Sequence, residues 1–146
     1  MKLLNEPKNR INAVAASALT VGKAAYINTD GKLAHPTDAA TAAEAVYFIQ
    51  RPREYCVNFD GYSATITAGE LVEGINGFKA IFDTAELNIA DDFTAVNKGT
   101  KLGITNSGLI AKEASAAANT TGLLRLISFT GNTTSGQLEA IVDFRI

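Results

Sequence analysis

The sequence has few of the residues on which most catalytic and metal-binding sites depend. Its 146 residues include one cysteine, one histidine and no tryptophan. A single cysteine cannot form an internal disulfide, and residues 1–18 contain no apolar run long enough for a secretory leader. We therefore expect the chain to be made in a reducing cytoplasm. A structural zinc site is not expected, because Cys56 and His35 cannot supply several ligands at the usual spacing.

Long apolar runs, phosphate-binding loops and an excess of positive charge are also missing. No stretch approaches the roughly 20 apolar residues that span a bilayer, and no Gly-x-Gly-x-x-Gly or Walker-type loop occurs. With 13 basic and 15 acidic residues the formal net charge is −2, which gives no general positive field for holding nucleic acid. We expect neither a membrane nor nucleic acid as a partner, and no cofactor.

Catalysis through histidine would have to use His35, which precedes Pro36 in a predicted loop. We expect an ordinary exposed loop histidine at this position. Cys56 lies in a short apolar run without a cationic cluster that would activate it, which favours a buried, inert thiol. No nucleophile is evident, and we predict that the chain is not an enzyme.

Oxygen ligands for a metal ion are more plentiful. Asp83, Glu86, Asp91 and Asp92 lie close together in the sequence, and NTDG at 28–31 is similar to a fragment of a calcium-binding loop. The full spaced pattern, which ends in a bidentate glutamate, is missing. We interpret the carboxylates as solvated surface groups and NTDG as an ordinary turn, and we expect no metal.

Signals for β-strands dominate what the sequence does contain. Asp30-Gly31 supplies the positive φ angles of a tight hairpin turn. Residues 137–146 alternate apolar and polar at period two, and residues 77–84 do the same, which indicates a half-buried strand or one face of an interface. The alanine-rich segment 37–45 predicts one short helix or a flexible loop. We predict an all-β fold, a small β-barrel or β-sandwich with at most one short helix.

A weak internal repeat accompanies these strands. The segment GKAAYINTDGKL matches GTKLGITNSGLI, which lies 77 positions later. The matching positions are Gly22, Ile27, Gly31 and Leu33 in the first segment and, in the same order, Gly99, Ile104, Gly108 and Ile110 in the second. The same spacing aligns AVYFIQR at 45–51 with GLLRLIS at 122–128. Two interpretations stay open: hairpins that resemble one another by chance, or two similar hairpin halves within a single β-rich domain over residues 19–146.

The beginning of the chain fits no helix or strand template well. Residues 2–12 are polar, contain Pro7 and have a local basic excess, so we predict that residues 1–18 form a flexible N-terminal arm. Such an arm could become ordered on a neighbouring subunit by adding a strand to its sheet edge. The candidate partner-binding residues are its apolar anchors and its cations, namely Lys2, Leu3, Leu4, Lys8, Arg10 and Ile11.

These features together resemble a known family. A polar basic start, then LTVGKAAYINTDGKLAHPTDAATAAEAVYFI, and later AVNKGTKLGITNSGLIAKEA, is similar to the small capsid decoration (cement) proteins of tailed bacteriophages. The resemblance implies a structural virion protein, often a homotrimer, that sits on the capsid surface and bridges subunits of the major capsid protein. It carries over no catalytic residue. The chain departs from a simple single barrel in being long enough for extra strands around 55–90.

Two other classes of function remain as alternatives. Another phage structural component, such as a tail-tube or head-completion protein, would have a similar composition and would assemble into rings or stacks. A carbohydrate-binding or adhesion module would need an exposed aromatic platform. The candidates for such a platform are the four tyrosines, Tyr26, Tyr47, Tyr55 and Tyr62, which we expect to pack at strand edges.

Overall fold

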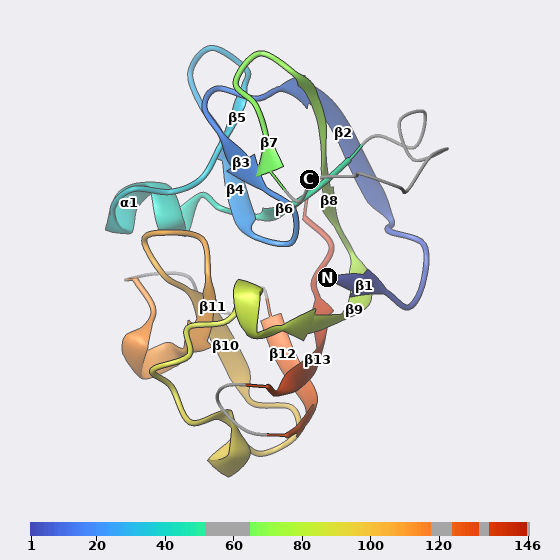
Figure 1. Ribbon diagram of the computed structural model, residues 1–146, viewed down its shortest axis with the longest axis vertical. Helices are drawn as coiled ribbons and strands as arrows, with labels where there is room; N and C mark the ends of the chain where they lie inside the picture. Colours follow the sequence, from blue (N-terminus) through green and yellow to red (C-terminus); the bar gives the residue numbers. More distant parts are fainter. Residues whose placement is uncertain (52–64, 118–123, 132–134, 146) are drawn as a thin grey trace.

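The fold consists of two β-sheets that lie one above the other along the long axis of the molecule (Figure 1). The computed structural model describes residues 1–51, 65–117, 124–131 and 135–145. In spatial order the upper sheet contains β2 (Asn9–Val14), β8 (Leu71–Asn76), β6 (Tyr47–Gln50), β4 (Ala24–Ile27) and β5 (Leu33–Ala34). The lower sheet contains β1 (Lys2–Leu3), β9 (Phe78–Asp83), β13 (Gln137–Val142), β12 (Leu124–Thr130), β10 (Lys101–Ile104) and β11 (Ile110–Lys112). A separate pair joins β3 (Leu19–Thr20) to β7 (Thr65–Ile66).

Helical structure is limited to short segments in the described part of the chain. The one α-helix there is α1 (Ala39–Ala43), and the 3-10 turns are η2 (Thr84–Glu86), η3 (Phe93–Ala95) and η4 (Glu113–Ser115). None of these helices has the length and apolar character needed to cross a lipid bilayer. The predicted all-β class with at most one short helix is confirmed. Neither sheet closes on itself, so the architecture is sandwich-like and not a barrel.

The helix predicted within 37–45 forms because its first turn is capped. The Asp38 side chain accepts the Thr41 backbone N–H at 2.8 Å, and the Thr41 hydroxyl accepts the Asp38 backbone N–H at 3.2 Å. This reciprocal capping box satisfies two donors that a helix start leaves unpaired. It holds a five-residue helix that would be marginal by itself.

The spacing of 77 residues recurs in the hydrogen-bonded registers of the two sheets. Ala24 pairs with Phe48 across β4 and β6, and Lys101 pairs with Arg125 across β10 and β12. The β4–β5 hairpin has the same register as the β10–β11 hairpin, with Ile27 opposite Leu33 and Ile104 opposite Ile110. The two turn glycines, Gly31 and Gly108, both have positive φ.

The remaining strands also correspond, at other spacings. Asn9 pairs with Asn76 across β2 and β8, and Phe78 pairs with Val142 across β9 and β13. The strand order β2-β8-β6-β4-β5 is therefore repeated as β9-β13-β12-β10-β11. The structure consists of two similar halves joined at Gly77, and the differences in spacing fall in the loops. The first half begins at β2, earlier than the predicted domain boundary at residue 19.

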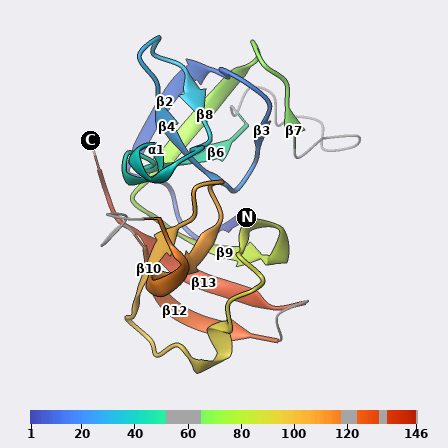
Figure 2. The same ribbon diagram turned by 90° about the vertical axis from the view of Figure 1, so that its left-hand side faces the viewer.

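The structure has two apolar cores, and the larger one joins the halves. The smaller core lies within the first half and includes Leu19, Leu33, Ile49 and Val72. The larger core fills the second half, and it also contains Phe48 from the upper sheet. The ring of Phe48 lies 5.9 Å from that of Phe78 and 5.4 Å from that of Phe82, between ring centroids. One face of the upper sheet thus packs onto the core of the lower half, and both views show the two layers one above the other (Figures 1 and 2).

The prediction of a flexible arm over residues 1–18 is wrong. Lys2–Leu3 pair with β9, and Asn9–Val14 pair with β8 along the whole of that strand. The prediction rests on the polar side chains of the segment, whereas strand pairing is made by backbone N–H and C=O groups that every non-proline residue carries. A polar segment can therefore be ordered wherever a sheet edge is open to it.

Candidate functional site

The structure separates the six predicted partner-binding residues into two groups. Lys2, Leu4 and Lys8 are exposed, so they remain available to a partner. The other three turn inward: Leu3 packs against the larger core, Ile11 packs against the smaller core, and Arg10 is held by two ion pairs.

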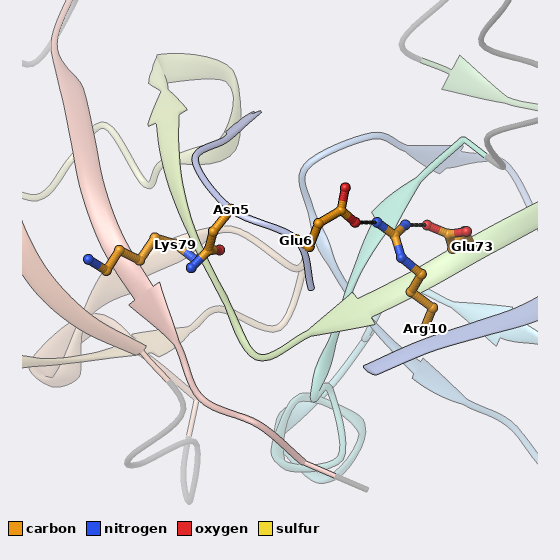
Figure 3. Close-up of polar contacts among 5 residues, drawn as sticks. All are labelled: Asn5, Glu6, Arg10, Glu73 and Lys79. Carbon is orange, nitrogen blue, oxygen red and sulfur yellow. Dashed lines mark hydrogen bonds and ion pairs between the residues drawn. The ribbon is translucent and has the colours of Figure 1, made fainter. Parts of the chain in front are cut away.

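Arg10 lies between two carboxylates (Figure 3). One guanidinium nitrogen bonds to Glu73, which is buried on β8, and another lies 2.7 Å from the exposed Glu6 carboxylate. Hydrogen bonds to a charged partner are stronger than neutral ones, and a buried carboxylate needs such a partner. Arg10 therefore stabilises Glu73 in the fold and is not free to bind another protein.

Polar contacts fix the first residues against β9. The terminal ammonium of Met1 lies 2.6 Å from Glu86 Oε1, Leu4 N–H donates to Lys79 O at 2.9 Å, and Lys79 N–H donates to Asn5 Oδ1 at 2.8 Å. Figure 3 shows Asn5 reaching the backbone of β9. Burial raises the pKa of the Glu86 carboxyl, and the adjacent ammonium acts in the opposite direction by favouring the anion.

The exposed residues of this segment adjoin a row of side chains on the lower sheet. Strand pairing aligns Lys79 of β9 with Ile141 of β13, Ile141 with Arg125 of β12, and Arg125 with Lys101 of β10. Directly opposed residues project from the same side of a sheet. With Leu4 at its end, this row is called the outer face below, and it consists of Leu4, Lys79, Ile141, Arg125 and Lys101.

The outer face combines cations with exposed apolar side chains. Leu4 is 43% exposed and Ile141 is 41% exposed, and Phe144, next to them in the last segment, is 43% exposed. A cleft of about 230 Å³ lies beside the row, lined among others by Lys8, Lys79, Ile141 and Phe144. Exposed apolar groups interleaved with cations are typical of a surface that contacts another macromolecule.

The repeat gives a structural counterpart for this surface. In the first half the positions of Lys101, Arg125 and Ile141 are occupied by Ala24, Phe48 and Ile75. Those three residues are fully buried, on the side of the upper sheet that packs onto the lower half. The same side of the same kind of sheet is thus an internal contact in one half and a solvent-facing surface in the other.

The structure corrects the prediction for His35. The ring is partly buried, its Nε2 accepts the Thr20 backbone N–H at 2.8 Å, and its Nδ1 donates to Ala24 O at 2.7 Å. Burial lowers the pKa of His35, the nearby Lys23 charge lowers it further, and the hydrogen bond to Ala24 opposes both. His35 is a neutral residue that connects β3 to β4, and not an exposed loop histidine.

Two of the four predicted surface carboxylates are buried. Glu86 binds the Met1 ammonium, and Asp91 accepts the Lys112 backbone N–H at 2.9 Å together with the Ser115 hydroxyl. The other two, Asp83 and Asp92, are exposed caps of η2 and η3. In the described residues, no group of three or more histidine, cysteine or acidic side chains is arranged to hold a metal ion.

The remaining candidates fall into three classes. NTDG is an ordinary turn, as predicted, because the Asn28 side chain accepts the backbone N–H groups of Asp30 and Lys32. Among the tyrosines, Tyr47 is buried and Tyr26 packs partly against the larger core. Cys56, Tyr55 and Tyr62 lie outside the described residues.

Sequence reasoning missed three residues of the outer face, Lys101, Arg125 and Ile141. The alternation in residues 77–84 did indicate that Lys79 belongs to a polar face that could form an interface. The alternation over 137–146 places Ile141 on the side opposite to Leu138 and Ala140. Nothing in the sequence gives the order in which these strands pair, so the row itself was not predictable.

Comparison with models of known protein families and with curated proteins found no match for this chain.

Proposed function

We propose that this chain is a non-enzymatic structural protein that binds a protein surface through its outer face, and that the surface is the outside of a tailed-phage capsid. The outer face is the observation that carries the proposal. It presents three cations and two exposed apolar residues on a sheet that is fixed by pairing on both sides of β9. A rigid patch of this kind loses little conformational entropy when it binds.

The chemistry of the outer face favours an acidic, partly apolar partner. Lys79, Arg125 and Lys101 project from one row, although the whole chain has a net charge of −2. Complementary charge increases association rates and aligns the partners, while the apolar groups between the cations contribute burial. Carboxylates on the subunits of the major capsid protein would meet these cations.

The counterpart of the outer face supports the same conclusion. In the first half, the equivalent side of the sheet is already a protein-binding surface, because Phe48 and Ile75 pack onto the second half. A sheet of this shape is therefore suited to packing against another β-layer. We propose that the protein assembles on the capsid as a homotrimer, bridging neighbouring subunits.

A co-sedimentation experiment tests the proposal. Purified protein is mixed with undecorated shells, assembled from the major capsid protein that is encoded in the same genome. The Lys79→Glu/Arg125→Glu variant should bind at least roughly tenfold more weakly, because each reversal replaces an attraction by a repulsion. Binding of the unmodified chain should also weaken as salt increases.

Lys32→Glu is the control for a charge reversal away from the outer face, since Lys32 is an exposed lysine in the β4–β5 turn of the upper half. It should bind as the unmodified chain does. Failure of the unmodified chain to sediment with the shells would contradict the capsid as the partner. Rings or stacks formed without shells would favour a tail-tube or head-completion protein instead.

A further inference from the structure

The two halves differ at one sheet edge. In the second half β9 is covered by β1, which pairs Lys2 with Ile81 and Leu3 with Ala80. In the first half the counterpart of β9 is β2, and no described strand pairs with the outer side of residues 9–13, whereas Ala15, just beyond them, bridges to Leu33 of β5. β2 is six residues long, whereas the other edge strands, β1, β5 and β11, have two or three residues each. Residues 9–13 of β2 are thus the longest open edge in the described part of the chain.

The backbone of β2 is oriented for strand addition. Ala15 N–H donates to Glu70 O. Along an antiparallel strand the backbone N–H and C=O groups of successive residues point alternately to one neighbour and to the other. The odd-numbered residues of β2 therefore bond to β8. The backbone N–H and C=O groups of Arg10 and Asn12 point to the open edge, which β5 closes just beyond residue 13, where Ala15 bridges to Leu33 and Ala16 N–H donates to Leu33 O at 2.9 Å. The corresponding groups on β9 point to β1, as the bond from Leu4 N–H to Lys79 O shows.

The apolar residues beside this edge are incompletely covered. Ile11 and Ala13 of β2 are only partly buried, although both pack against the smaller core. Their counterparts Ala80 and Phe82 on β9 are fully buried, and Leu3 of β1 packs against the same core as they do. A strand beside β2 with an apolar side chain at the position equivalent to Leu3 would complete the burial of Ile11 and Ala13.

We propose that the open edge of β2 binds an extended segment of another polypeptide by antiparallel strand addition. The segment has apolar side chains at alternate positions, since these would lie on Ile11 and Ala13 as Leu3 lies on the larger core. Backbone hydrogen bonds to Arg10 and Asn12 give the binding, and the partly covered apolar residues give the preference for sequence. This edge is separate from the outer face and does not depend on the capsid as partner.

A synthetic peptide with the sequence of residues 1–6 is the probe, because that segment occupies the counterpart edge of β9. It is titrated into the full-length isotope-labelled chain and followed by NMR. Saturable shifts should centre on β2, and amide hydrogen exchange should slow at Arg10 and Asn12. The same peptide carrying Leu3→Asp should bind at least roughly tenfold more weakly.

Asn12→Pro tests the backbone contact directly. Proline removes the outward N–H of residue 12 and is tolerated at edges, where it does not disturb the pairing of Ile11 and Ala13 with β8. Continued protection of those two amides shows that the variant is folded. Asn12→Pro should abolish peptide binding, and Asn12→Ala, which keeps the N–H, should retain it.

Three outcomes would overturn strand addition by another polypeptide at β2. The first is the absence of saturable shifts at β2. The second is a set of shifts centred on Lys79 and Ile81, because the peptide would then be replacing β1 on β9. The third is a dimer of the unmodified chain that Asn12→Pro dissociates, since the occupant of the edge would then be a second copy of β2.

Discussion

At the scale of single residues, the side chains that determine the structure are polar ones with fixed partners. Glu73, Glu86 and Asp91 are buried carboxylates, and each binds a cation, an N–H group or a hydroxyl group. A buried charge without such partners would cost several kcal/mol. His35 belongs with them, because both of its ring nitrogens are used.

His35 should make stability depend on pH. Burial lowers its pKa below the ordinary value of 6.5, so its contribution is complete above about pH 6.5 and is lost as the pH falls through the folded-state pKa. The protonated ring can no longer accept the Thr20 N–H. The His35→Gln variant should be less stable at pH 7.5 by roughly 1–2 kcal/mol, and the difference from the unmodified chain should shrink toward pH 5. Urea unfolding at a series of pH values measures both. A difference that does not change with pH would show that protonation of His35 is not coupled to unfolding.

The residue scale is also where the sequence was least informative. A lone histidine before a proline gives no sign that the Ala24 carbonyl and the Thr20 amide will lie on either side of its ring. Arg10 and Glu73 are 63 positions apart, so nothing local marks them as partners. The alternation around Lys79 was visible, and it correctly placed Lys79 on the polar side of β9.

At the scale of elements, the repeat shows which differences between matching segments have consequences. The β4–β5 and β10–β11 hairpins share register and turn geometry, but their surroundings differ. A side chain at Gly31 would meet nothing within 4 Å, whereas one at Gly108 would lie 2.8 Å from Ala24 O. Gly108 O also accepts the Ala24 backbone N–H at 2.9 Å. The second hairpin is therefore part of the contact between the halves.

This difference provides a matched pair of variants. Both glycines have positive φ, so an alanine at either position is strained by about 1–2 kcal/mol. Gly31→Ala should show that cost alone. Gly108→Ala should lose a further 1–3 kcal/mol or so through overpacking against Ala24. Chemical denaturation compares the two, and equal losses would mean that the contact with Ala24 is relaxed without cost.

The strands themselves were largely predictable, and their neighbours were not. Period-two alternation located β9 and β13, Asp30-Gly31 located the first hairpin turn, and the spacing of 77 residues located its counterpart. The prediction for the segment before residue 19 is wrong because the order of this segment comes from backbone pairing with residues 57 to 79 positions later. Such pairing leaves no local pattern in the sequence.

At the scale of the whole molecule, the two halves use the matching sides of their sheets differently. The upper sheet docks onto the lower half through Ala24, Phe48 and Ile75, and the matching side of the lower sheet has Lys101, Arg125 and Ile141 instead. Terminal units of repeat structures need a polar outer surface to remain soluble. The two cations therefore disfavour stacking of a further half through an apolar sheet face like the one that Ala24, Phe48 and Ile75 form.

The same arrangement predicts how the molecule unfolds. Phe48 is fully buried and contacts Phe78 and Phe82 of the other half, so Phe48→Ala should cost about 3–5 kcal/mol. Because the larger core includes residues of both sheets, neither half can lose its structure without exposing that core, and the unmodified chain should unfold in a single transition. Calorimetry with amide hydrogen exchange on the full chain distinguishes a single transition from independent unfolding of the two halves. Phe48→Ala should weaken protection in β9 and β13 as much as in β6 and β8. Loss confined to the upper sheet would mean that the halves are independent units, joined only at Gly77.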